Sequence, residues 1–111
     1  MRKTDKKLDN TLRLALTEVC DIALKDIAGF QWLTHCVNYL NFPQSLKIIC
    51  VFDTNERLRC FNNSHYSVTL EELIQSKLGN ITLKNISKHI AYDSEENCDK
   101  EHDGQWGKRL D

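Results

Sequence analysis

The chain has 111 residues, of which 41% are hydrophobic and 28% are charged, with only four Gly and one Pro. This composition is typical of one folded domain and excludes a disordered or low-complexity chain. Fifteen Lys and Arg against sixteen Asp and Glu leave a net charge of −1, so the basic excess of many nucleic-acid-binding domains is absent. We therefore expect residues 1–111 to form a single α/β (or α+β) domain.

The start of the chain and its cysteines bear on the compartment. Residues 1–7 are charged and no signal-peptide core follows them, and the longest apolar run, residues 48–52, is far shorter than the roughly 20 residues that cross a bilayer. The five cysteines are odd in number and include no C-x-x-C pair, so neither a disulfide framework nor a zinc ribbon is indicated. We expect a cytoplasmic protein without membrane contact.

Two helices are predicted in the first part of the chain. Apolar residues recur at steps of three and four between Leu8 and Ile27, which marks one stripe of an amphipathic helix, and Gly29 ends it. The same spacing over residues 30–40 predicts a second helix, which stops before Pro43 because the residue that precedes a proline avoids helical backbone. Residues 1–7 would precede this pair of helices as a basic N-terminal arm.

A β-α-β unit is predicted next. Residues 45–53 are nearly continuous in β-branched and aromatic character, which favours a central strand covered on both faces. Thr69 and Glu72 match a capping box, which predicts a helix from Thr69 to a stop at Gly79. Alternation over residues 86–92 predicts a second strand. Strand, helix and strand in this order indicate a right-handed crossover between parallel strands.

The last section of the chain, residues 93–111, is acidic at its start. The residues up to Asp103 include six acidic side chains and one lysine, which fits either a short acidic helix or a mobile tail. Such a helix would begin at Asp93 or Ser94 and end near Gly104. Trp106 favours docking of this section onto the domain, because an isolated tryptophan is stabilised mainly by burial.

The two predicted strands end alike, with VFDTNE at residues 51–56 and AYDSEE at residues 91–96. Parallel strands would place Asp53 and Asp93 at the edge where open α/β sheets bind ligands. A third carboxylate could come from Glu56, Glu95 or Glu96, of which we select Glu96. The three carboxylates could hold Mg²⁺ or Mn²⁺ and support a metal-dependent enzyme that acts on phosphodiesters. The alternative, which we favour, is the turn and helix-capping chemistry of Asp followed by Thr or Ser.

Positive charge is concentrated at the N-terminus, in Arg2, Lys3, Lys6 and Lys7. These side chains are candidates for contact with nucleic-acid phosphates or with an acidic protein partner. They could equally be the solvated start of the first helix. A sheet of two or three strands also leaves edges that need cover, which favours a homodimer.

The segments FPQSLKIICVFDTN (residues 42–55) and DSEENCDKEHDGQW (residues 93–106) resemble a family of short bacterial proteins of about this length. Some members of that family are labelled Fis-type transcriptional regulators, after the factor for inversion stimulation. The resemblance implies transcription regulation and DNA binding through a C-terminal helix-turn-helix. The last forty residues depart from that pattern, because they predict a strand and an acidic segment without a basic recognition helix. No DNA-contacting residue is therefore carried over from the family.

The sequence leaves two functions open. The first is a binding or regulatory module without cofactor, whose partner is a protein or a nucleic acid bound through the N-terminal basic residues. The second is the metal-dependent enzyme, with Asp53 and Asp93 as ligands of Mg²⁺ or Mn²⁺. The sequence contains none of the common motifs of nucleotide binding, zinc proteolysis or serine hydrolysis.

Overall fold

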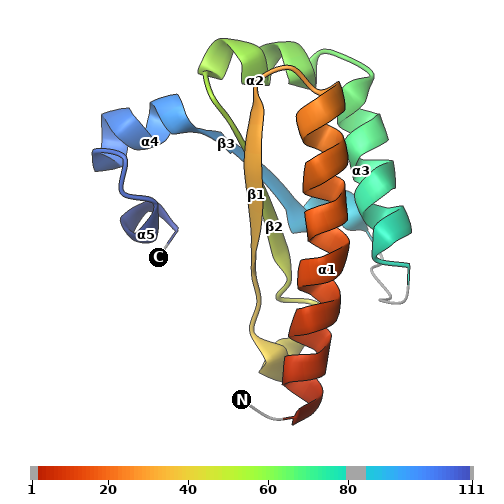
Figure 1. Ribbon diagram of the computed structural model, residues 1–111. Coiled ribbons are helices and arrows are strands. Elements are labelled where there is room, and N and C mark those ends of the chain that lie inside the picture. Colours follow the sequence, from red (N-terminus) through yellow and green to blue (C-terminus); the bar gives the residue numbers. More distant parts are fainter. Residues whose placement is uncertain (1–2, 80–84, 111) are drawn as a thin grey trace.

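A three-stranded sheet with the strand order β1-β2-β3 lies at the centre of the structure (Figure 1). The computed structural model describes residues 3–79 and 85–110. The strands are β1 (Phe30–Cys36), β2 (Lys47–Phe52) and β3 (Ile90–Ser94). β1 and β2 are antiparallel, whereas β2 and β3 are parallel. This mixed sheet, with helices before, between and after its strands, makes the protein a small α+β domain.

The helices lie on different sides of the sheet. In chain order they are α1 (Lys3–Asp26), α2 (Asn55–Asn62), α3 (Tyr66–Lys77), α4 (Glu95–His102) and α5 (Trp106–Arg109), with 3-10 turns at Tyr39–Asn41 and Ile86–His89. α1 and α3 pack against one another and share the core with β2. α4 and α5 follow β3 and lie on the side of β1 that faces away from α1 (Figure 1).

Strand β2 is the central element of the core, as its sequence predicts. Every residue of β2 except Lys47 is buried. Ile48, Cys50 and Phe52 belong to the core cluster that also contains the apolar stripe of α1. Alternate residues of a strand point to opposite faces, so Ile49 and Val51 belong to the second face, where they are also buried. Both faces of β2 therefore need cover.

The predicted second helix is wrong. Residues 30–36 form strand β1, and a 3-10 turn follows it. Phe30, Trp32 and Thr34 suit a strand better than a helix, and β2 has backbone groups on two edges that must be hydrogen-bonded once they are buried. Strand β1 supplies hydrogen-bonding partners for the first of these edges, with Leu33 opposite Cys50 in the antiparallel pair.

The parallel β2-β3 pair is confirmed, but the elements around it differ in detail from the prediction. The connection holds two helices, and the spacing did not predict α2. α3 begins at Tyr66, and the Thr69 hydroxyl donates a hydrogen bond to the His65 carbonyl at 3.1 Å instead of capping the helix. β3 starts later than predicted, because residues 86–89 form a 3-10 turn.

The predicted acidic helix is confirmed as α4, which begins after Ser94 and ends before Gly104. Trp106 docks onto the domain, because its ring contacts that of Trp32 in β1. Within residues 3–79 and 85–110, no helix combines the length and the hydrophobicity that a membrane span requires.

Gly29 makes the reversal between α1 and β1, and only glycine fits there. Its φ is +85°, and a Cβ at this position would lie 2.6 Å from Arg57 Cδ and 2.9 Å from Asp53 Oδ1. The Gly29 carbonyl also accepts a hydrogen bond from the Asp53 N–H at 2.9 Å. The turn therefore links the start of β1 to the end of β2.

We expect Gly29→Ala to lower the free energy of unfolding by about 1–3 kcal/mol, because it adds backbone strain and a clash with Arg57. Gly107→Ala is the matched control, since a Cβ there meets nothing within 4 Å. That change should be neutral, or stabilise by up to about 1 kcal/mol. Urea denaturation of both variants measures the difference, and equal effects would contradict this role for Gly29.

Candidate functional site

The carboxyl ends of β2 and β3 both lead directly into helices. Thr54 caps α2 by accepting a hydrogen bond from the Arg57 N–H at 3.2 Å, and Ser94 caps α4 in the same way from the Asn97 N–H at 3.0 Å. Asp53 and Asp93 each accept a hydrogen bond from the N–H of the next residue, at 2.7 and 2.8 Å. The repeated sequence is therefore a repeated strand-to-helix turn, in which the hydroxyl residue is the N-cap.

The two turns bind one another through side chains. Asn55 donates a hydrogen bond from Nδ2 to Asn97 Oδ1 at 2.7 Å and accepts one from the Ser94 hydroxyl at 2.5 Å. The Asn55 N–H donates to Glu96 Oε1 at 3.0 Å. Ser94 is fully buried in this cluster. The edge of the sheet where a ligand was predicted is thus occupied by the polar side chains of the turns themselves.

Asp93 forms a two-point ion pair with Arg109. Arg109 donates from Nε to Oδ2 at 2.5 Å and from Nη2 to Oδ1 at 2.9 Å, and both side chains are largely buried, at 13% and 17% exposed. Partial burial by itself raises the pKa of Asp93, but the hydrogen bonds and the charge of Arg109 outweigh it, so the pKa lies below its usual value. Arg109 also pairs with Glu101. The ion pair fastens α5 to β3.

The other two predicted metal ligands also have cationic partners. Asp53 Oδ2 lies 3.5 Å from Arg57 Nη1, and Glu96 Oε2 lies 2.9 Å from Lys100 Nζ. The hydrogen bond from the Asn55 N–H, followed by that from Lys100, lowers the pKa of Glu96. In the described parts of the chain, no three His, Cys, Asp or Glu side chains form a group that could hold a metal ion. A metal at Asp53, Asp93 and Glu96 would have to displace cations of the protein itself.

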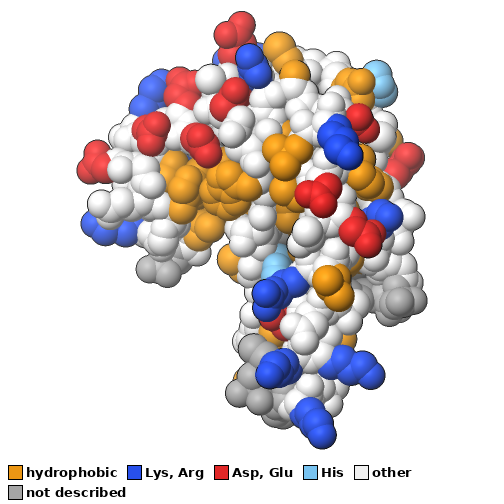
Figure 2. All heavy atoms as spheres, viewed as in Figure 1, with side chains coloured by type: hydrophobic (Ala, Val, Ile, Leu, Met, Phe, Trp, Pro, Cys, Tyr) orange, Lys and Arg blue, Asp and Glu red, His pale blue; other side chains and the backbone are white. Residues whose placement is uncertain are grey.

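The predicted basic residues belong to helix α1. Lys3, Lys6 and Lys7 lie in its first turns and are exposed, so these residues are not a separate arm; Arg2 lies outside the described residues. The acidic residues of the same segment face inward, because Asp5 is only 9% exposed and Asp9 is partly covered. Figure 2 shows Lys and Arg side chains gathered over the N-terminal half of α1.

Asp9 is held by residues that follow strand β1 or belong to it. Asp9 Oδ1 accepts a hydrogen bond from the Tyr39 hydroxyl at 2.8 Å. The same oxygen lies 3.3 Å from His35 Nε2. The Tyr39 hydrogen bond is the main cause of the lowered pKa of Asp9, while burial opposes it and His35 and Arg13 add to it. In return, burial and then Asp9 raise the pKa of Tyr39 to about 12. This cluster ties the start of α1 to the end of β1.

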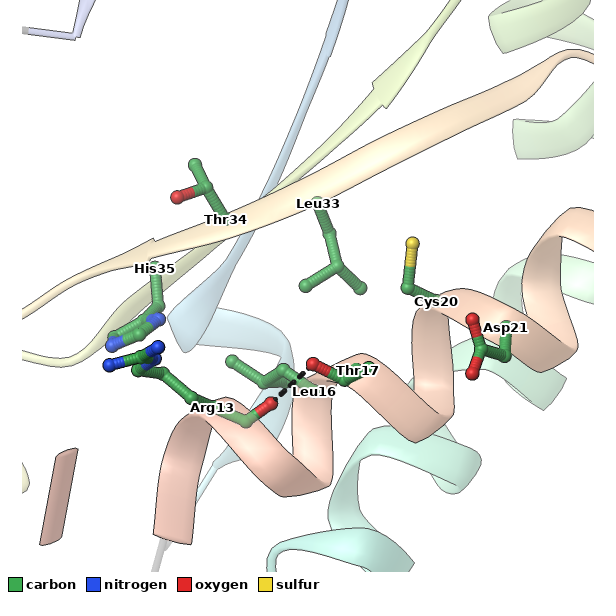
Figure 3. A pocket seen from close by; sticks show the side chains of 8 residues that line it. All are labelled: Arg13, Leu16, Thr17, Cys20, Asp21, Leu33, Thr34 and His35. Atoms are coloured by element: carbon green, nitrogen blue, oxygen red, sulfur yellow. Dashed lines mark hydrogen bonds between the residues drawn. The ribbon is translucent and has the colours of Figure 1, made fainter. Parts of the chain in front are cut away.

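A groove of about 390 Å³ runs between α1 and β1 (Figure 3). It is lined by Arg13, Leu16, Thr17, Cys20, Asp21, Leu33, Thr34 and His35. Arg13 and His35 lie at one end and Asp21 at the other (Figure 3). The Arg13 side chain is 68% exposed, and its ion pair with Asp9 is long, at 3.9 Å. Its guanidinium is therefore accessible to an anion from outside.

Three of the cysteines, Cys20, Cys50 and Cys98, lack nucleophilic activation. Burial is the main cause that raises the pKa of the Cys20 thiol and raises the pKa of Cys50 to about 12. Burial likewise raises the pKa of Cys98. These three side chains remain thiols at neutral pH, and the thiolate is the reactive form.

The sequence does not predict the cluster of Asp9, His35 and Tyr39, because the apolar spacing of residues 30–40 indicates a helix where β1 lies. One signal was available. Asp5 and Asp9 precede Leu12 and Leu16 at spacings of four and three residues, so they lie on the same face of α1 as its apolar stripe. Acidic residues on the inner face of a helix need polar partners, and such residues must come from elsewhere in the chain.

No protein-family model, curated protein or solved structure matches this chain. In residues 85–110 the structure has β3, the acidic α4 and the four-residue α5. Of these helices, α4 is acidic, and α5 contains Lys108 and Arg109 within a single turn.

We expect Asp93→Asn to lower the free energy of unfolding by about 1–3 kcal/mol, because it removes the two-point, largely buried partner of Arg109 and leaves only the exposed Glu101 paired with it. If Asp93 were one of several mutually repelling metal ligands, the same change would leave the metal-free protein as stable as wild type or more stable. Asp99→Asn is the control, since Asp99 is an exposed acid on α4. Thermal and urea unfolding with chelator and then with Mg²⁺ or Mn²⁺ distinguish the two cases.

The same ion pair predicts how stability changes with pH. The pKa of Asp93 is lower in the folded protein than its ordinary value of 3.8, so the contribution of the pair is complete well above pH 3.8. It is lost as the pH falls below 3.8 and through the folded-state pKa. Unfolding of wild type and Asp93→Asn should therefore differ at neutral pH and converge in acid. A difference that stayed constant down to the acid limit would contradict this assignment.

Proposed function

We propose that the protein is a non-enzymatic binding module that contacts the phosphate backbone of nucleic acid through one face of α1. This basic face consists of Lys3, Lys6, Lys7 and Arg13. The observation that carries the proposal is the separation of charge on this helix. Its cations are exposed, whereas Asp5 and Asp9 face inward.

Helix geometry places the four cations on the same side. At about 100° per residue, Lys3, Lys6, Lys7 and Arg13 fall within an arc of about 120°. No acidic residue of α1 lies on this arc before Asp21, which is beyond the basic face toward the end of the helix. An array of exposed cations on a rigid helix can follow a row of phosphates, and its affinity depends strongly on salt.

The basic face continues into the groove between α1 and β1. Arg13 belongs to both, and His35 stands beside it, oriented by Asp9. A phosphate chain that followed α1 from Lys3 to Arg13 would thus end at a concave surface, to which His35 adds one more nitrogen-bearing side chain. Contacts of this kind recognise phosphate and not base sequence, so the proposal includes no sequence-specific reading of DNA.

Metal-dependent hydrolysis of phosphodiesters receives less support. Its three predicted ligands, Asp53, Asp93 and Glu96, are each paired with Arg or Lys of the same chain. All three also accept a backbone hydrogen bond at the strand-to-helix turns. These contacts support a structural role for the three carboxylates. The binding assay is also run with Mg²⁺ or Mn²⁺, so that cleavage of the nucleic-acid probe would be detected.

The test compares two variants that lose the same charge. The first replaces Lys3, Lys6 and Lys7 with Gln, and the control replaces Arg59, Lys88 and Lys108 with Gln, which are exposed outside α1. Fluorescence anisotropy with labelled single- and double-stranded DNA and RNA is measured over a range of salt. We expect the first variant to bind at least about tenfold more weakly at low salt, with a salt slope reduced by about 3. The control should retain most of the binding.

Three results would overturn the proposal. Wild-type protein that binds none of the four probes at low salt would exclude it, and an equal loss in both variants would show that only net charge matters. Probe cleavage that requires Mg²⁺ or Mn²⁺ and stops with chelator would instead support the enzyme. Circular dichroism should be the same for both variants, because Gln has a helix propensity close to that of Lys.

A further inference from the structure

Two tryptophans and a glutamate meet on the second face of the sheet. Trp32 in β1 and Trp106 in α5 pack edge to face, with ring centroids 4.8 Å apart and planes at 83°. The indole N–H of Trp32 donates a hydrogen bond to Glu95 Oε1 at 3.2 Å. We call these three residues the tryptophan corner. All three side chains are only partly buried, so the corner is open to a partner.

The structure holds this corner in place. Glu95 is the first residue of α4, directly after the buried cap Ser94. Trp106 is the first residue of α5, which the Arg109 ion pair fastens to Asp93 in β3. Trp32 lies within β1 and is paired with Val51 of the central strand. Both rings are therefore held by elements of the folded domain, Trp32 by the sheet and Trp106 by α5.

The surroundings of the corner are acidic. Asp99, Glu101 and Asp103 on and after α4 are exposed, although Glu101 pairs with Arg109. The exposed cations of α4 and α5 are Lys100, which pairs with Glu96, and Lys108. Figure 2 shows hydrophobic side chains gathered between α4 and β1, with acidic side chains along their upper border. Glu95 uses Oε1 for Trp32, while Oε2 accepts no hydrogen bond within residues 3–79 and 85–110. A partly exposed aromatic surface with an acidic border is complementary to a partner that is both cationic and able to stack.

We propose that the tryptophan corner binds an arginine side chain presented by a basic segment of a partner protein. The faces of indole rings attract cations, and guanidinium is the cation that most often stacks on them. Its planar fork can also donate hydrogen bonds to a carboxylate such as Glu95 Oε2. A lysine ammonium would gain the charge attraction without the stacking, so arginine is the preferred residue.

This interaction is separate from the proposed contact with nucleic acid. The basic face lies on the first turns of α1, whereas the tryptophan corner lies on the opposite side of the sheet beside α4 (Figure 1). The two surfaces also have opposite charge, and the acidic border repels phosphate. Either interaction can therefore be disproved while the other stands.

The intrinsic fluorescence of the protein tests the proposal directly, because the chain contains only two tryptophans and both belong to the corner. The probe is an acetylated and amidated hexapeptide, Gly-Arg-Gly-Gly-Arg-Gly. Its titration should change the tryptophan emission and reach saturation. The same peptide with Lys in place of Arg should bind more weakly, and the peptide with Gln should produce no change.

Glu95→Gln is the decisive variant. It removes the charge but keeps an oxygen that can accept the Trp32 hydrogen bond, so the corner should stay folded. We expect it to weaken binding of the arginine peptide by roughly two- to fivefold. Glu72→Gln, on the exposed surface of α3, is the control with the same change in net charge and should bind like wild type.

Several outcomes would overturn the proposal. Equal emission changes with the Arg and Gln peptides, or no change at any concentration, would exclude arginine recognition. Equal weakening in the Glu95 and Glu72 variants would assign the effect to net charge. Emission that changes on dilution of the protein without peptide, together with a change of oligomeric state, would show that a second copy of the chain covers the corner.

Discussion

The structure depends on one strand that must be buried on both faces. β2 has five consecutive buried residues, so its backbone needs hydrogen-bonding partners on two edges and its side chains need cover on two sides. β1 and β3 supply the partners, and α1 with α3 covers the first face. The second face is covered near Trp32 by α4 and α5, which explains why the acidic end of the chain docks. The burial of β2 thus sets the position of nearly every other element.

The cluster around Asn55 and Ser94 makes the crossover specific. Two strand-to-helix turns of similar sequence lie side by side, and each satisfies polar groups of the other. A buried polar network of this kind is costly when incomplete and favours one arrangement when complete. Here it fixes α4 relative to α2 and places Glu95 beside Trp32. A sequence repeat that resembles a ligand site therefore has a clear structural use.

A net charge near zero conceals two surfaces of opposite sign. On α1 the inward orientation of Asp5 and Asp9 means that, within this helix, no exposed acidic residue shares the face of Lys3, Lys6 and Lys7 before Asp21. On α4 and the turn that follows, acidic residues predominate on the surface even though Arg109 neutralises part of them. Overall charge governs long-range behaviour, whereas binding depends on such local fields. The two proposed interactions follow from this separation.

The sequence by itself determined the elements whose pattern has one physical solution. The long stripe of α1, the apolar run of β2, the acidic helix after Ser94 and the parallel β2-β3 pair were all predictable, because the residue pattern defines each element and a helical crossover connection indicates parallel strands. Residues 30–36 were not, since their apolar spacing fits a helix as well as a strand and only pairing with β2 decides between them. The same holds for function. The sequence identified Lys3, Lys6 and Lys7, but only tertiary structure turned Asp9 toward Tyr39, paired Asp93 with Arg109 and brought Trp32 to Trp106, because these contacts join residues that lie 16 to 74 positions apart in the chain.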